Sequence, residues 1–532
     1  MTAGDGRPLP GQPAVPGNDW PSLRPPALGG WTPTRTVSVV VPAHDASRTL
    51  PYALAALAQQ TYPAELTEVV VVDDGSDPPL TLPAERPEHT RMVTTSASWG
   101  RAHACHVGAC AAQGEVLHWL DADLLAHPDE LEAQMRWHHL VDYAVVLGTK
   151  TFVDVADGLP DLEELARMLR EGRATDLFPG RWTSPHTWVE EQIEHSQGLT
   201  ANPTMSYLVH VGASASVGRD LYLDTGGMDP ELKLGEDVEL GYRLGQQGAL
   251  FVPDREALSW HLGRSTLMAD QDRVNAYNRP FVTDRVPDLR HWRTKGRSYT
   301  VPWVEVVVDA TEQTYTDVRH SVIAVLTGAV TDVRVVVLGP WLRLTDGRRS
   351  PLADPDRDLR MVRAELEGDP RVRFVEELPR TAFPATFRLL LPTGWAPGPD
   401  TVRRLAREMT RRDRGLVSMV LPDGRTARLE RTSAFNRAAR VAAARPDRDM
   451  EAGLDDLVDQ VSRTWWFDGP EEGFTHVCAV PATEPGTRAA GGGRPGRTQT
   501  GSARRDDLAG DGTQHHLPSA RDLLSRAIRR RR

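Results

Sequence analysis

Short apolar runs that end in acidic residues dominate the first quarter of the chain. Residues 37–41, 69–72 and 116–120 are almost uniformly apolar, and leucines at helical spacing follow the first run. Strands that are apolar on both faces and alternate with helices favour a mostly parallel sheet covered by helices on both sides. In such folds ligands bind at the carboxyl edge of the strands. The sequence therefore predicts an α/β fold with a polar site at that edge.

The most informative acids at such an edge are Asp121 and Asp123, which follow the third apolar run with one residue between them. Two carboxylates at this spacing can hold a divalent cation through oxygen ligands, and that cation can hold a diphosphate. An isolated pair of this kind also fits a solvated loop. Glu236 and Asp237, which open a predicted helix much later in the chain, strengthen the interpretation as a site.

The composition narrows the class of protein. With 532 residues the chain can build two or three domains, and its apolar fraction of 40% and charged fraction of 25% are typical of soluble globular proteins. A net charge of −11 disfavours a general nucleic-acid binder. The three cysteines have neither a disulfide framework nor a metal-binding spacing, and no segment has the pattern of a membrane span or a secretory signal. We therefore expect a cytoplasmic protein.

The second half of the chain faintly repeats the pattern of the first half. Residues 304–308 and 333–337 correspond to the first two apolar runs, and residues 390–394 correspond to the run that ends in the acidic pair. The copy has Pro392 and Gly394 in place of those two acids. This pattern predicts a second α/β domain that kept the fold and lost the charges. An unrelated valine-rich α/β domain remains the alternative.

These patterns divide the chain into four parts. Residues 1–34 are rich in Pro and Gly, which predicts a flexible leader; residues 35–300 form the first α/β domain and residues 301–483 the second. Residues 484–532 are rich in Gly, Arg and Thr, which predicts a disordered basic tail. Its last residues can form a basic helix that touches anionic lipid at the inner face of a membrane, although such ends are more often solvated.

Five short motifs follow one another in a recognisable order. They are Pro42-Ala43-His44-Asp45, Asp73-Asp74-Gly75-Ser76, Asp121-Ala122-Asp123, Gly235-Glu236-Asp237 and Ser259-Trp260-His261-Leu262. This order resembles the family 2 nucleotide-sugar glycosyltransferases of the GT-A fold, and the later segment also resembles a galactosyltransferase-type motif. The resemblance covers about residues 36–265, roughly half of the chain. It implies that the first domain is catalytic and that the second is a degenerate GT-A-like domain.

The resemblance also implies a role for each motif. The residues expected to hold the nucleotide sugar are Pro42, Ala43, Asp45, Asp73, Asp74 and Asp121. Asp123 and His261 are expected to hold a cation, and an oxygen-rich site with one imidazole suits Mn²⁺ or Mg²⁺. Asp237 is expected to be the general base, with Glu236 supporting the base or the acceptor. A base at this position implies a single displacement that inverts the anomeric carbon.

Two departures from the family pattern leave the nucleotide contacts open. Relatives often have Arg-Asn before the glycine of the helix that leads to the acidic pair, whereas here Ala104-Cys105-His106 precede Gly108. Asp45 stands in place of the usual asparagine after the first strand. The metal and base positions stay intact.

The resulting expectation is a metal-dependent hexosyltransferase that moves a sugar from a UDP-sugar to a saccharide, lipid-linked or small-molecule acceptor. Bacterial polysaccharide or cell-wall synthesis is the setting that the resemblance implies. The second domain could position the acceptor or form a homodimer surface. A non-catalytic sugar-nucleotide-binding scaffold and a bifunctional polymerase remain alternatives, although Pro392 and Gly394 argue against a second metal site. Nucleotidyl transfer is disfavoured, because the residues after the first strand are not a phosphate-binding loop rich in Gly and basic residues.

Overall fold

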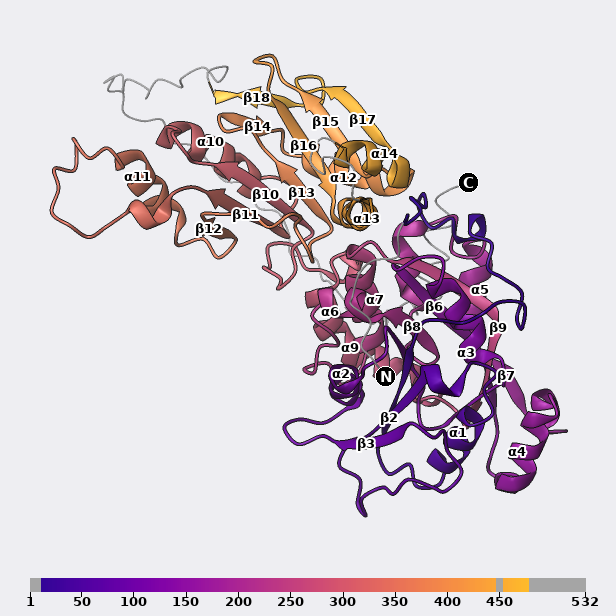
Figure 1. Cartoon of the computed structure of the whole chain (residues 1–532). Coiled ribbons are helices and arrows are strands. Elements are labelled where there is room, and N and C mark those ends of the chain that lie inside the picture. The colour runs from indigo at the N-terminus through magenta and orange to yellow at the C-terminus, as the bar shows by residue number, and fades with distance from the viewer. Residues whose placement is uncertain (1–10, 446–452, 478–532) are drawn as a thin grey trace, which may run out of the picture. The chain divides into compact units, whose positions relative to one another are not determined.

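The computed structural model describes residues 11–445 and 453–477, which fold around two large sheets (Figure 1). The predicted basic tail, residues 484–532, lies outside the described residues, and so does its predicted lipid contact. Among the described helices, none combines the length and the apolar character needed to cross a membrane.

The first sheet has the strand order β3-β2-β1-β4-β8-β6-β9-β5, and β7 pairs with β6. Strands β3, β2, β1 and β4 are parallel, whereas β8 is antiparallel to both of its neighbours. The strands are β1 (Val37–Ala43), β2 (Thr67–Asp73), β3 (Thr90–Thr94), β4 (Val116–Trp119), β5 (Leu124–Ala126), β6 (Ala144–Val153), β7 (Thr183–Pro185), β8 (Ala215–Gly218) and β9 (Leu250–Leu262). The α/β fold predicted for the first domain, with its mostly parallel sheet, is confirmed.

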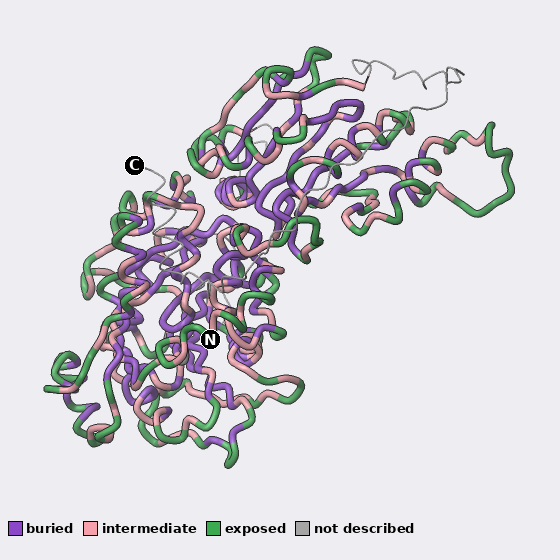
Figure 2. Tube along the Cα trace, turned by 180° about the vertical axis from the view of Figure 1, so that it is seen from behind, coloured by how far each residue is buried: buried purple, intermediate pink, exposed green. Residues whose placement is uncertain are grey.

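Helices cover this sheet because its central strands are apolar on both faces, and the strands are accordingly buried along their length (Figure 2). Val39 and Val40 of β1 point to opposite faces, and each belongs to a different cluster of buried apolar side chains. The helices are α1 (Leu50–Leu57), α2 (Arg101–Ala111), α3 (Glu130–His138), α4 (Leu162–Arg170), α5 (Thr187–His195), α6 (Arg219–Asp224), α7 (Glu236–Gln246), α8 (Thr266–Ala269) and α9 (Gln271–Arg285). The packing of α2 on the sheet is so close that a Cβ on Gly108 would lie 2.8 Å from a methyl group of Val72.

The second sheet has the order β12-β11-β10-β13-β16-β15-β17, and a separate pair joins β14 to β18. Its strands are β10 (Val304–Asp309), β11 (Val333–Leu338), β12 (Val372–Val375), β13 (Phe387–Leu390), β14 (Trp395–Pro397), β15 (Leu416–Val420), β16 (Thr426–Arg431), β17 (Thr464–Asp468) and β18 (Phe474–His476). The helices that accompany it are α10 (Tyr315–Leu326), α11 (Arg357–Leu366), α12 (Thr401–Arg412), α13 (Thr432–Ala443) and α14 (Leu454–Ser462).

The two sheets share one topology, as expected for the predicted repeat. In both, the first strand lies between the second and the fourth, the next strand is antiparallel, and the one that follows reverses again. The pair β14–β18 occupies the place of β5–β9: Leu124 pairs with His261, and Trp395 pairs with His476. Pro392 therefore takes the place of Asp121 in the second sheet.

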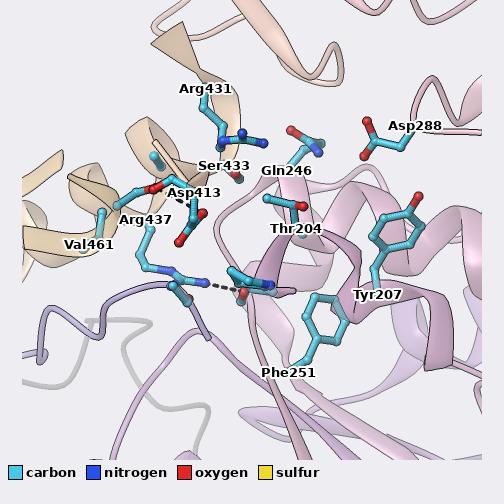
Figure 3. Close-up of a pocket in the computed structure, with 16 residues that line it drawn as sticks. Thr204, Tyr207, Gln246, Phe251, Asp288, Asp413, Arg431, Ser433, Arg437 and Val461 are labelled. Atoms are coloured by element: carbon cyan, nitrogen blue, oxygen red, sulfur yellow. Dashed lines mark hydrogen bonds between the residues drawn. The ribbon is translucent and has the colours of Figure 1, made fainter. Parts of the chain in front are cut away.

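Side chains and backbone of both sheets meet in one compact unit that ends at Val477. Arg437 on α13, labelled in Figure 3, donates to the carbonyls of Gly248 (2.8 Å), Ala249 (2.6 Å) and Val15 (3.1 Å). It also donates to the carbonyl of Gly17. The boundary predicted at residue 300 thus separates the sheets along the sequence, but it does not separate two independent bodies.

Residues 11–34 differ from the flexible leader that their composition predicts. Val15 is buried in the core, and the Asn18 side chain both donates to the carbonyl of Phe251 (2.8 Å) and accepts from its amide (2.9 Å). This segment lacks hydrophobic periodicity because single side chains anchor it, without any regular helix or strand that would give a period. Composition alone therefore predicted the wrong state for it.

Candidate active site

Acidic side chains from two distant segments meet at the carboxyl edge of the first sheet, where Arg101 joins them. Arg101 opens α2, and its Nε donates to Asp121 Oδ1 (2.8 Å) directly after β4. Its Nη1 donates to Asp237 Oδ1 (2.7 Å) and to Glu236 Oε1 (3.3 Å) in the first turn of α7. The structure thus brings the predicted donor-site acid and the predicted base to opposite sides of one guanidinium group. Sequence analysis missed Arg101, whose only signal was its place at the start of a helix next to the sheet edge.

The predicted metal ligands also lie side by side. Because Leu124 pairs with His261 across β5 and β9, His261 Nε2 comes within 3.9 Å of Asp123 Oδ2. Burial raises the pKa of Asp123, against the pull of His261, and burial lowers the pKa of His261. A lowered pKa favours the neutral imidazole, which is the form that binds metal ions.

Asp123 and His261 are too few to coordinate a divalent cation by themselves, so a bound substrate or water would have to supply further ligands. Within residues 11–445 and 453–477, no group of three or more His, Cys, Asp or Glu side chains is arranged to hold a metal ion. Mn²⁺ and Mg²⁺ commonly complete their coordination with phosphate oxygens and water, so two protein ligands such as Asp123 and His261 could suffice. The Asp123 side chain is 38% exposed, so a ligand can reach it from solvent.

The described cluster holds more carboxyl groups than cations. Arg101 and Lys150 are the cations that face the carboxyl groups of Asp121, Asp123, Glu236 and Asp237. Lys150 on β6 is buried and donates to the carbonyl of Ala213, and burial lowers its pKa to about 8. Burial, together with the neighbouring Asp237, raises the pKa of Glu236 to about 7. A divalent cation would favour the ionised forms of these carboxyl groups.

The predicted base is held in place from two sides. Gly235 is the N-cap of α7, so Asp237 does not cap the helix, and Leu240 and Leu244 are buried on the same helix. His210 Nδ1 donates to the backbone carbonyl of Asp237 (2.7 Å). Gly212, with a φ of +69°, lies directly against the carboxylate: a Cβ there would be 2.6 Å from Asp237 Cγ.

The residues predicted to bind the nucleotide follow β1 and β2 at the same edge, but they differ in how free they are. Both carboxylate oxygens of Asp73 accept backbone amides, from Ser76 (3.0 Å) and Leu80 (3.0 Å), so Asp73 organises the loop after β2. Asp74 accepts from Gly100 N (2.6 Å), just before Arg101. Ala43 is buried in the wall next to Pro42, whereas the Asp45 side chain is exposed.

His106, one of the departures from the family pattern, has a structural partner. Its Nδ1 lies 3.0 Å from the hydroxyl of Tyr222, and a Cβ on Gly227 would overlap the imidazole ring. This histidine therefore packs α2 against the turn after α6, away from the acidic cluster. The departure accordingly leaves the acids of the candidate site unchanged.

A separate polar cavity lies between the two sheets at the other end of α7 (Figure 3). Its volume is about 560 Å³ including the open mouth, and its walls include Tyr207, Gln246, Asp288, Asp413 and Arg431. The Tyr207 hydroxyl and Gln246 Oε1 are buried there without a hydrogen-bond partner. No residue of the predicted site lines this cavity, so we assign the chemistry to the acidic edge of the first sheet.

The first sheet is mixed and mostly parallel, has the acidic cluster at its carboxyl edge, and is followed by a second sheet of the same topology. Residues 38–188 match the family described as Glycosyl transferase family 2. The chain therefore carries a domain of glycosyl transferase family 2.

Curated relatives are similar over part of their length. The chain is 22% identical to chondroitin synthase of Escherichia coli over 370 residues, which is 64% of this chain and 50% of the relative. It is 28% identical to validoxylamine A glucosyltransferase of Streptomyces hygroscopicus subsp. jinggangensis over 236 residues, which is 42% of this chain and 54% of the relative. The chain thus spans about half the length of these relatives.

Two solved structures show a weaker likeness. Mannosyltransferase PcManGT from Pyrobaculum calidifontis, in complex with GDP-Man and Mn²⁺, has a TM-score of 0.32 at 17% identity, covering 50% of this chain and 66% of that one. TarS from S. aureus has a TM-score of 0.28 at 16% identity, covering 46% of this chain and 39% of that one.

Proposed function

We propose that this protein transfers a sugar from a nucleoside-diphosphate sugar to an acceptor hydroxyl, with inversion at the anomeric carbon. The observation that carries the proposal is the meeting of Asp121 and Asp237 on Arg101, beside the pair Asp123 and His261, within a family 2 domain. A non-catalytic binder would not need an acid fixed as closely as Asp237 is by Gly212 and His210.

The donor is proposed to lie along the carboxyl edge of the first sheet. Pro42, Ala43, Asp45 and Asp74 would form the nucleotide wall, and Asp121 would face the ribose or the diphosphate. Asp73 would act through the loop that it organises. Asp123 and His261 would hold Mn²⁺ or Mg²⁺, which would offset the charge on the leaving diphosphate. A UDP-sugar is the proposed donor, by family resemblance.

Side chains of this site could carry out the displacement of the nucleoside diphosphate by the acceptor. Asp237 would accept the proton of the acceptor hydroxyl while the acceptor oxygen attacks the anomeric carbon. The bond from that carbon to the diphosphate oxygen breaks on the opposite face, and its electron pair leaves with the nucleoside diphosphate. Glu236, with a pKa of about 7, can donate a hydrogen bond from its neutral form to a bound acceptor at neutral pH. Lys150 would offset charge within the pocket.

For the acceptor we propose only a chemical class, not a particular molecule. The relatives are named for a polysaccharide synthase and for a glucosyltransferase that acts on validoxylamine A, so a saccharide or a small hydroxylated molecule fits best. Bacterial polysaccharide synthesis remains the proposed setting. The second sheet would position the acceptor or provide a dimer surface.

Turnover tests the proposal directly. UDP-, GDP- and dTDP-sugars are incubated with the full chain, with and without Mn²⁺, and release of nucleoside diphosphate is followed in a coupled assay. Asp237→Asn should lower the rate by about 10²-fold or more, as expected for loss of a general base. Asp455→Asn, in the first turn of α14, is the control and should leave the rate unchanged. Persistence of the wild-type rate in Asp237→Asn would refute the role of the base.

A further inference from the structure

One exposed indole stands directly beside the acidic cluster. Trp99 is 66% exposed and precedes Gly100 and Arg101, whose partners are Asp74, Asp121, Glu236 and Asp237. Single exposed aromatic side chains are common on protein surfaces, so the position of Trp99, and not its exposure alone, makes it a candidate binding residue. Trp466, in the second sheet, has a similar exposure of 63% but lies on β17, far along the chain from these acids.

Lys233 holds the Trp99 ring by one face. Its ammonium group lies 4.6 Å from the ring centroid and donates to Ser98 Oγ (3.3 Å), to the carbonyl of Pro230 (3.0 Å) and to the carbonyl of Trp99 itself. These three acceptors use all three hydrogens of the ammonium group, a geometry that a planar guanidinium cannot reproduce. The chain has three lysines among 62 basic residues, so the choice of lysine here is unusual.

The Lys233 contact fixes the ring in the loop that leads to Arg101, the residue that binds the candidate base. Lys233 precedes Asp237 by four residues, and a Cβ on Gly100 would lie 3.1 Å from Lys233 Cδ, so the two loops are in close contact. A ring with one face fixed by a cation presents its other face to solvent without further ordering. A binding partner therefore loses little conformational entropy when it stacks there.

We propose that Trp99 is the stacking platform for the pyranose ring of a saccharide acceptor, an assignment that rests on the proposed transfer reaction. A pyranose has an apolar face of C–H groups for the indole and a rim of hydroxyl groups for the neighbouring carboxylates. Both features are present here: an exposed aromatic ring, and carboxylates that are bound by the next two residues, Gly100 and Arg101.

Saccharide binding can be measured without turnover. Saturation-transfer NMR is recorded on the full chain with a mixture of methyl glycopyranosides (gluco, galacto, manno, N-acetylglucosamine and glucuronate). Trp99→Ala should weaken binding of the responding glycoside about tenfold, which corresponds to ~1.4 kcal/mol. Trp99→Phe should recover most of the affinity, and the matched control Trp466→Ala should bind as the wild type does. Failure of every glycoside to bind the wild type, or equal binding by Trp99→Ala, would overturn the platform.

Donor turnover by the wild type separates this proposal from the transfer reaction itself. Glycoside binding that depends on Trp99, without nucleoside diphosphate release from any sugar nucleotide, would leave a saccharide site and refute the transfer. Metal-dependent release together with glycoside binding that ignores Trp99 would support transfer and refute the platform. Where both hold, the acceptor KM of Trp99→Ala should rise, since the variant loses contacts to the acceptor.

Discussion

Gly212→Ala should disable the candidate base without removing any functional group. The added Cβ would lie 2.6 Å from Asp237 Cγ, where ordinary contacts begin at 3.4 Å, so the carboxylate must retreat by about 1 Å. A misplacement of that size costs about a hundredfold in rate, or ~2.7 kcal/mol of activation free energy. The Cβ would also lie 2.7 Å from Arg101 Nη2, so Arg101 offers the carboxylate no alternative position without moving itself.

Alanine at a positive φ also strains the backbone, and a second glycine measures that cost separately. Gly180 has a φ of +71°, against +69° for Gly212, and a Cβ there would meet nothing within 4 Å. Both variants should lose ~1–2 kcal/mol of unfolding free energy from strain. Only Gly212→Ala should lose rate in the assay of nucleoside diphosphate release. A rate for Gly212→Ala within about fivefold of that for Gly180→Ala would refute the fixed position of Asp237.

The remaining predictions concern the metal pair, the titration of the cluster and the joint between the sheets. His261→Ala should abolish the Mn²⁺-dependent rise in melting temperature with nucleotide, whereas His476→Ala, at the same place in the second sheet, should leave it intact; an equal loss in both would remove His261 from the metal site. Burial raises the pKa of Glu236 from 4.5 to about 7. Between these two pH values the carboxyl group of Glu236 is ionised in the unfolded chain and still protonated in the folded one. The free energy of unfolding should therefore fall as the pH rises through this range, by at most ~3 kcal/mol. Glu236→Gln should flatten that fall in urea titrations, and an unchanged slope would contradict the raised pKa. Arg437→Met leaves several buried carbonyls without donors and should cost ~3 kcal/mol or more in urea unfolding. Arg440→Met loses one partly buried carbonyl partner, Gln247, and one exposed ion-pair partner, Asp224, so it should cost only ~1 kcal/mol. Equal costs would show that Arg437 does not hold the joint.

The sequence carried enough information to predict the fold, because the strands that build it are buried on both faces. Val39 and Val40 had to be apolar whichever face they pointed to, and the same pattern in residues 304–308 predicted the second sheet. The leader was predicted wrongly because composition cannot show that a single side chain such as Asn18 anchors an irregular segment. Pairing of Leu124 with His261 depends on strand register, which a motif alone does not contain.

Arg101 could not be assigned from sequence for a different reason. Its role depends on which way one guanidinium group points, and the acids that it joins are separated by more than a hundred residues. Gly212 was equally hidden, since its importance comes from the side chain that its missing Cβ leaves room for. The positions of the acids could therefore be predicted from the sequence, whereas the residues that fix them, Arg101 and Gly212, could not.

The second sheet shows which parts of the candidate site depend on one another. It lacks the acids, since Pro392 and Gly394 replace them, and it lacks a helix at the place of α2, because residues 376–386 connect β12 to β13 with no helix among them. The long insertion between β6 and β8, which carries Gly212, is a short hairpin between β15 and β16. Restoring two aspartates at positions 392 and 394 would place carboxylates without Arg101 or the insertion to orient them. The charge, the helix and the insertion therefore act as one unit, and the loss of all three in the second sheet is consistent with chemistry confined to the first.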